Sequence, residues 1–440
     1  MTQGLRIKIA EWLDPGAARG DELRATWARL EIYVDDHIAT KVVDSFTARS
    51  VRDAIYVPAY PLAEWIATHW WFLLFERHEA RPGFDRRHCL RYAGDGFAFP
   101  SVTILSDGIK SSIEIEPRAS PNAGVQFLEG FCATVDQTQV FEEFRSFISA
   151  VCLRLEEQNV HGTLLQEDWK AISSARQDEI DFCQCVASMG RDPYALEADE
   201  VSAVLAVREQ VQSDLLWNDL TESISLQTLV SCANWLQNAA SEVRHTVKFE
   251  PSVSRHDLNG ALHPHNSAGW QQGYEGARSL WATGKLKVEG GAGRLDWGSV
   301  FKNWEGPSWL NKHRVTTAPE KTIHALIEAA EDRFGIAVSS SKGLRKESQA
   351  FLMARALSEF LWHESSAIGH SLLTASQAWR QQRSRAFAAE LLAPSSDIEN
   401  QLSGSRISND EVDDLADHYG VSDWVIRHQL KNHELAIVRD

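Results

Sequence analysis

The segment HESSAIGH brings His363, Glu364 and His370 close together along the chain. Imidazole nitrogens and carboxylate oxygens are the usual protein ligands of zinc, so these three residues are a candidate metal site. If the segment were helical, seven residues would separate the two histidines by about 10.5 Å along the axis. Two nitrogens bound to one zinc ion lie only about 3–3.5 Å apart. The spacing therefore disfavours a shared zinc ion, although a loop at Gly369 would relax that limit.

A second group of histidines, His256, His263 and His265, flanks Pro264. The surrounding stretch is rich in glycine, proline and tryptophan, which is typical of irregular structure. Histidines in a polar loop are usually exposed, so we expect surface residues here, and a metal site is the less favoured alternative.

The elements that must position these side chains lie in residues 246–440, where four segments resemble, in order, parts of ImmA/IrrE-type zinc metallopeptidase domains. The segments are SAGWQQGYEGARSLWATGKL, ALIEAAEDRFGIAV, SRAFAAELLAP and DDLADHYGVSDWVIRHQLKNH. The resemblance implies a lead-in helix, a helix followed by the first strand, the helix after the catalytic one, and a closing helical segment. It predicts a mainly helical, zincin-like C-terminal domain.

The same resemblance implies where a zinc site would lie. In such domains the two histidines of a His-Glu-x-x-His helix bind Zn²⁺, the glutamate is the general base, and a later helix supplies a glutamate ligand. Matching QAFLMARALSEFLW to that helix puts Arg355 and Glu359 at the two histidines and Ala356 at the general base. Arg383 stands at the third ligand. A guanidinium group cannot lose its proton to bind a metal, so we expect a degenerate site with no catalytic residues and no bound metal or other cofactor.

The replacements have a charge pattern of their own. Arg355 and Glu359 are four residues apart, the spacing at which opposite charges pair on one helix. With Arg383 they are predicted to form a structural cluster, and the alternative is a site for an anionic ligand or a partner's carboxylate. Buried charges need partners, so under both hypotheses Glu359 contacts at least one of the two arginines.

The segment LADHYGVSDWVIRHQL resembles a helix-turn-helix, with Gly420 at the turn and Ser422 as the N-cap of the second helix. A DNA-binding helix needs basic residues, and only Arg427 and Lys431 stand on this one. The acidic NDEVDD precedes it. These two residues are candidate nucleic-acid contacts, but DNA binding is disfavoured.

The remainder of the chain predicts an α+β protein in three parts. Residues 1–165 should form an α+β domain with hairpins in ARLEIYVDDHIATKVVDSF and SVTILSDGIKSSIEIEPR, a helix from Pro61 to Phe75 that is buried all round, and an amphipathic helix in QVFEEFRSFISAVCLRLEEQ. Residues 166–245 read as a helical linker or bundle, ahead of the C-terminal domain at 246–440.

The composition and charge of the sequence limit the cellular location and the classes of partner that we expect for this protein. The formal net charge of −17 disfavours nucleic-acid binding unless basic residues cluster locally. The N-terminus lacks an apolar signal region, the six cysteines are scattered, and the most apolar run, YPLAEWIATHWWFLLF, is too short and polar to span a bilayer. We expect a cytoplasmic protein without a membrane partner.

The favoured function is that of a catalytically inactive ImmA/IrrE-like regulator or sensor that binds another protein. The resemblance implies a bacterial stress, toxin–antitoxin or phage-defence setting. One alternative is a zinc metallo-endopeptidase with ligands among His363, Glu364 and His370, and another is a DNA-binding transcriptional regulator. The sequence indicates neither the partner's identity nor the oligomeric state.

Overall fold

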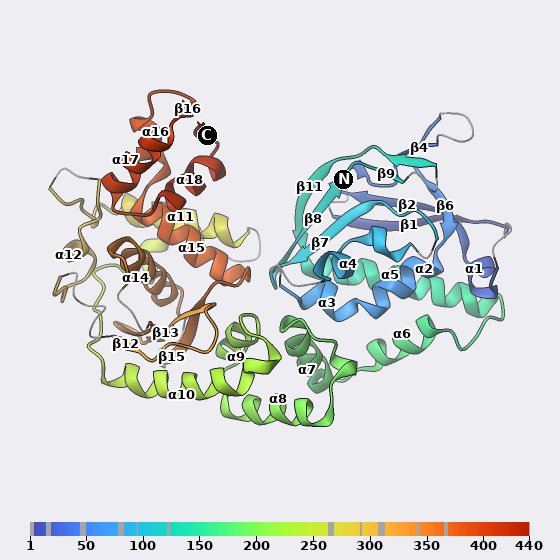
Figure 1. The fold of residues 1–440 in the computed structure, drawn as a ribbon, viewed down its shortest axis with the longest axis horizontal. Coiled ribbons are helices and arrows are strands. Elements are labelled where there is room, and N and C mark those ends of the chain that lie inside the picture. The colour runs from blue at the N-terminus through green and yellow to red at the C-terminus, as the bar shows by residue number, and fades with distance from the viewer. Residues whose placement is uncertain are drawn as a thin grey trace. The chain divides into compact units, whose positions relative to one another are not determined.

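The chain contains two compact units, Met1–Leu196 and Glu197–Asp440. The computed structural model describes residues 4–14, 19–44, 50–77, 83–94, 96–120, 124–262, 268–290, 293–306, 313–340, 344–364 and 368–439. Helices and mixed sheets occur in both units, which confirms the predicted α+β class (Figure 1). The boundary falls inside the stretch predicted as helical, so α6 (Leu164–Ser174) and α7 (Gln177–Ser188) belong to the first unit.

Antiparallel sheets form the framework of the first unit. One sheet joins β1 (Leu5–Trp12), β2 (Trp27–Val34), β3 (His37–Ile38) and β6 (Ile55–Pro58), and another has the order β11 (Phe131–Asp136), β8 (Lys110–Glu116), β7 (Ser101–Ser106). A third has the order β5 (Val51–Arg52), β4 (Val42–Asp44), β10 (Val125–Phe127), β9 (Arg118–Ser120). Both predicted hairpins are confirmed, as the β2–β3 and β7–β8 pairs.

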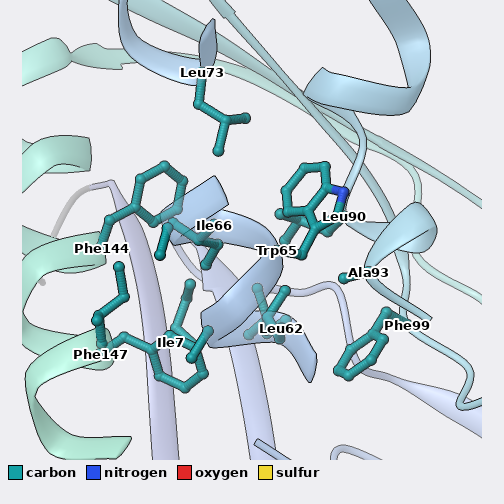
Figure 2. Packing of buried hydrophobic residues seen from close by; sticks show 14 of the residues in the cluster. Ile7, Leu62, Trp65, Ile66, Leu73, Leu90, Ala93, Phe99, Phe144 and Phe147 are labelled. Carbon is teal, nitrogen blue, oxygen red and sulfur yellow. The ribbon is translucent and has the colours of Figure 1, made fainter. Parts of the chain in front are cut away.

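The core of this unit surrounds the apolar segment that was predicted as one helix. The segment forms two helices, α2 (Tyr60–Thr68) and α3 (Trp70–Phe75), and is buried as expected. The prediction of a single helix is wrong because the chain leaves helical geometry at His69, whose ring Nδ1 lies 2.8 Å from the carbonyl oxygen of Trp65. Figure 2 shows buried side chains of both helices together with Ile7 of β1 and with Phe144 and Phe147 of α5 (Gln137–Glu157). The predicted amphipathic helix is confirmed as α5. The shorter helices are α1 (Asp21–Ala25) and α4 (Phe84–His88).

The second unit is mainly helical around one small sheet. The sheet has the order β12 (Arg314–Val315), β14 (Phe334–Ser339), β13 (Ile323–Ala329), β15 (Gly369–Thr374), and only β12 runs parallel to its neighbour. The helices are α8 (Ala198–Gln210), α9 (Asp214–Thr221), α10 (Leu229–His245), α11 (Gly269–Ala282), α12 (Trp297–Val300), α14 (Lys346–Leu361), α15 (Trp379–Leu392), α16 (Ser395–Gln401), α17 (Asn409–Tyr419) and α18 (Asp423–Asn432). The short strands β16 (Arg406–Ile407) and β17 (Ile437–Val438) pair near the end of the chain.

The segment ALIEAAEDRFGIAV forms the β13–β14 hairpin, so the helix-then-strand reading of it is wrong. β13 pairs with β14 on one edge and β15 on the other, and both α10 and α14 pack against it (Figure 1). A strand that is covered on both faces has a continuous apolar sequence, which in this segment also matches a helix. Burial in the sheet overrides the helical propensity of its alanines and leucine.

Helices α11 and α15 touch through their main chains. Gly269 and Gly273 of α11 lie so close to α15 that a Cβ at either position would collide with the carbonyl oxygens of Trp379 and Arg383, respectively. A third glycine, Gly276, leaves room for the ring of Trp362. The absence of side chains at these positions therefore allows the close approach that fixes α15 in place.

Candidate functional site

The positions where the resemblance expects zinc ligands lie on α14 and α15, beside β13 and β15. Arg355 on α14 is 2% exposed and points its guanidinium group toward β15 and α15. Its Nε donates to Ser384 Oγ at 3.1 Å, and its Nη2 donates to Gln381 Oε1 at 2.6 Å and to the Thr374 carbonyl oxygen at 2.8 Å. Its Nη1 lies 3.2 Å from His324 Nδ1. All four acceptors are neutral.

The environment of Arg355 lowers its pKa to about 9, first because burial removes water from the charged form and then because Arg385 lies nearby. A pKa of about 9 still leaves the guanidinium charged at pH 7. The side chain at the expected first ligand position is therefore a hydrogen-bonded cation.

Glu359 on α14 does not pair with Arg355, so the predicted i,i+4 ion pair is wrong. Its Oε2 accepts a hydrogen bond from Arg380 Nη2, and its Oε1 lies 3.4 Å from Arg383 Nη2. Burial alone would raise the pKa of Glu359, but the two arginines outweigh burial and hold the pKa below its ordinary value. The expected contact with Arg383 is present, and Arg380 is the partner that sequence reasoning missed.

Arg380 joins Glu359 to a second buried carboxylate. Its Nη1 donates to Asp219 Oδ1 at 2.8 Å, and Asp219 Oδ2 accepts from the backbone N–H of Leu372 at 2.9 Å. Burial raises the pKa of Asp219 to about 6 despite the nearby arginine. Asp219 connects α9 to β15 and α15, and a lone acidic residue among the buried residues of α9 was the only signal for it in the sequence.

The other two aligned positions, Arg383 and Ala356, are also not surrounded by a set of described side chains that could hold a metal ion. The guanidinium group of Arg383 lies over the rings of Trp362 and Trp379, 4.6 Å and 5.5 Å from their centroids. Burial lowers the pKa of Arg383 to about 10. Ala356 is fully buried in the apolar core, so no acid or base stands at the expected general-base position.

The three residues of the alternative zinc site have separate partners. Glu364 Oε1 accepts from Arg255 Nη2 at 2.7 Å, whereas His370 Nε2 lies 3.2 Å from Glu328 Oε2. His370 belongs to β15 and not to a helix, and the ring of His363 lies against Gly369. Within the described ranges, no three or more His, Cys, Asp or Glu side chains are grouped so that they could hold a metal ion. His263 and His265 lie outside the described residues.

The predicted helix-turn-helix segment forms α17 and α18, with Gly420 in the left-handed conformation between them. Ser422 occupies the N-cap position of α18 without a side-chain capping bond. Arg427 Nη2 donates to Asn409 Oδ1 at 2.7 Å, and Lys431 is exposed. The first helix exposes four aspartates, Asp410, Asp413, Asp414 and Asp417, which would repel a phosphate backbone.

Comparisons with models of protein families, with curated proteins and with solved structures find no match to this chain. Within the part that the structure describes, no helix combines the length and apolar character that a membrane span requires. The six cysteines are all free thiols, and Cys183 and Cys185 are buried on α7.

Proposed function

We propose that this chain has no zinc-dependent peptidase activity and acts by binding another protein, as a regulator or sensor. The observation that carries the proposal is the buried guanidinium of Arg355, hydrogen-bonded to neutral groups at the position where a metal ligand is expected. The resemblance of its C-terminal sequence to ImmA/IrrE-type domains supports a bacterial stress, toxin–antitoxin or phage-defence setting.

The electrostatics of the cluster argue against a divalent cation at the same place. Among the described residues, the side chains of Arg355, Arg380, Arg383 and Arg385 lie around two carboxylates, those of Asp219 and Glu359. Guanidinium groups present only N–H donors and offer no lone pair to a metal. A zinc ion would meet an excess of positive charge and no imidazole pair.

The test of the missing peptidase activity is a metal and activity measurement on the purified full chain. We expect far less than one equivalent of zinc or manganese by mass spectrometry after dialysis, and no chelator-sensitive cleavage of a fluorogenic peptide library. One equivalent of metal together with cleavage that a chelator abolishes would refute the proposal.

The test of the binding role is affinity purification of the tagged full chain from its own host. We expect one protein to co-purify in near-stoichiometric amount, and to be absent from a tag-only control. Binding should then be reproduced with the two purified proteins, and failure of that reconstitution counts against a direct partner.

A further inference from the structure

In the cluster around Glu359, four arginines lie near two carboxylates. Both carboxylates of the cluster contact Arg380, and Glu359 also contacts Arg383. Among the described residues neither Arg355 nor Arg385 makes a hydrogen bond or ion pair with a carboxylate, although the charges of Glu359 and Asp219 still favour the charged form of Arg355. Outside the described ranges the second unit contains one acidic residue, Asp440 at its C-terminal end.

The two unbalanced guanidinium groups converge on one point. Arg385 on α15 donates from Nη1 to the Thr374 carbonyl oxygen at 3.5 Å, and Arg355 Nη2 donates to the same oxygen at 2.8 Å. Arg385 Nη2 donates to Gln377 Oε1 at 3.1 Å. The like charge of Arg385 contributes to the lowered pKa of Arg355, and burial lowers the pKa of Arg385 itself to about 10.

A β-bulge places a third donor beside them. The pairing of β13 with β15 shifts register between Ile323 and Ala325, which makes His324 the extra residue. Bulges redirect a side chain and are frequent next to binding sites. Because a guanidinium can only donate, His324 Nδ1 accepts from Arg355, so the ring proton of the neutral imidazole is on Nε2. Burial and the two arginines lower the pKa of His324 to about 4, so it is neutral at pH 7.

We propose that Arg355, Arg385 and His324 form a binding site for a phosphoryl group. Two guanidinium charges match the roughly double negative charge of phosphate at neutral pH. Guanidinium groups also present N–H donors in a planar fork that fits phosphate oxygens. Arg385 uses two of its five N–H groups on described residues, and it is only partly buried, so donors are left for a ligand.

The energetic argument is that a buried charge without a counter-ion is costly. In a purely structural cluster, an apolar side chain in place of either arginine would avoid that cost. The presence of both arginines is therefore better explained by a ligand that carries the opposite charge. A bound dianion supplies the missing counter-charge, with the neutral imidazole as an additional donor. This site rests on the proposed function, because it occupies the place where a peptidase would hold its metal. It extends that function by naming a phosphoryl group as the ligand that the protein recognises.

The experiment is isothermal titration of the purified full chain with inorganic phosphate at constant ionic strength. The parallel arms are ADP, adenosine and acetate. We expect saturable phosphate binding and no binding of adenosine. Tighter binding of ADP than of phosphate identifies a nucleotide as the source of the phosphoryl group, and equal or weaker binding identifies free phosphate. Acetate that binds as tightly as phosphate would overturn the choice of a phosphoryl group.

The variant to test is Arg385→Gln, because the partly exposed Arg385 can be replaced with less risk to folding than Arg355. Loss of charge-assisted hydrogen bonds should weaken phosphate binding at least about tenfold. The matched control is Arg427→Gln on α18, which should bind phosphate like the unmodified chain. His324→Ala should weaken binding less than Arg385→Gln, since it removes a neutral donor.

Two results would overturn the site: no phosphate-specific heat with the unmodified chain, or unchanged affinity in a folded Arg385→Gln variant. Circular dichroism of each variant establishes that it is folded. The metal assay is independent of this titration, so bound zinc would refute the proposed function, whereas absent phosphate binding would refute only the anion site.

Discussion

Each of the two units contains a cluster of charged side chains around a buried glutamate, and the two clusters differ in whether every arginine has a carboxylate partner. In the first unit Glu76 is completely buried and Arg87 holds it with two hydrogen bonds, from Nε at 2.9 Å and Nη2 at 2.6 Å. His88 Nε2 lies 3.1 Å from the same carboxylate. In the second unit Arg355 is 2% exposed, and its hydrogen bonds go only to neutral acceptors. The proposed anion site rests on this difference, because Arg87 is paired with a carboxylate and Arg355 is not.

The sharpest test of this difference replaces each arginine by methionine. Arg87→Met leaves the buried Glu76 without its bidentate partner, so we expect a loss of about 3–5 kcal/mol in the free energy of unfolding of the first unit. Arg355→Met removes a charge that makes no carboxylate contact but leaves the Thr374 carbonyl and Gln381 Oε1 without a donor, so it should cost the second unit a smaller amount, about 1–3 kcal/mol. Urea unfolding followed by tryptophan fluorescence measures both. Equal losses would show that the two clusters do not differ as described.

A second test displaces the helix that carries much of the unbalanced cluster. Gly273→Ala adds a Cβ that collides with the backbone of α15, and such overpacking should destabilise the second unit by about 1–3 kcal/mol. Gly404→Ala is the matched control, because a Cβ there meets no atom within 4 Å. The same unfolding measurement applies, and a stability equal to that of the control would contradict the close main-chain contact.

A third test uses the pH dependence of stability. His324 has a folded-state pKa lowered to about 4, below its ordinary value, so between those values the unfolded chain takes up a proton that the folded chain does not. The contribution of His324 to the free energy of unfolding is therefore highest above about pH 6.5 and decreases as the pH drops toward 4. His324→Gln should remove a decline of about 2 kcal/mol over that range relative to the unmodified chain. The raised pKa of Asp219 has the opposite effect on stability as the pH falls. This effect is the same in the His324→Gln variant and the unmodified chain, so it does not contribute to the difference between them.

The control for the third test is His161→Gln, which replaces an exposed histidine of the first unit. Thermal unfolding at half-unit steps between pH 4 and 7 gives the slopes. If the His324→Gln profile keeps the slope of the unmodified chain, the imidazole does not lie among cations as described.

The smallest expected effect concerns a surface ion pair of the second unit. Glu364→Gln breaks the contact with Arg255, but the glutamate side chain is 77% exposed. Exposed pairs contribute little, so the free energy of unfolding should change by less than about 1 kcal/mol. Chemical denaturation of the variant beside the unmodified chain measures the change. A loss as large as that expected for Arg87→Met would mean that the residue has a structural role that its exposure does not indicate.

The periodicity of apolar residues in the sequence was sufficient to predict the long helices and strands. The amphipathic pattern of α5 and the alternation of β7 and β8 follow from the burial of one face, and these local rules hold in the structure. The same rules failed at β13, where burial on both faces leaves no alternation to detect. They also missed the break at His69, which depends on the geometry of a single residue.

The candidate site was less predictable because its contacts are long-range. Helix positions alone place Arg355 and Glu359 on one face, yet Arg355 turns to β15 and Glu359 to α15. Asp219 meets Arg380 across 161 residues of sequence, and no spacing rule links them. The register shift that exposes His324 to Arg355 appears only when the strands are paired.

Main-chain contact between α11 and α15 means that neither helix can shift without the other. The coupling continues outward, because Tyr274 of α11 accepts a hydrogen bond from Asn432 at the end of α18, and Gln429 of α18 donates to Glu390 of α15. Direct contacts thus join α11, α15 and α18, which carry between them the buried Arg383 and the exposed Trp424. A change in the position of α18 would therefore alter contacts that hold α11 and α15.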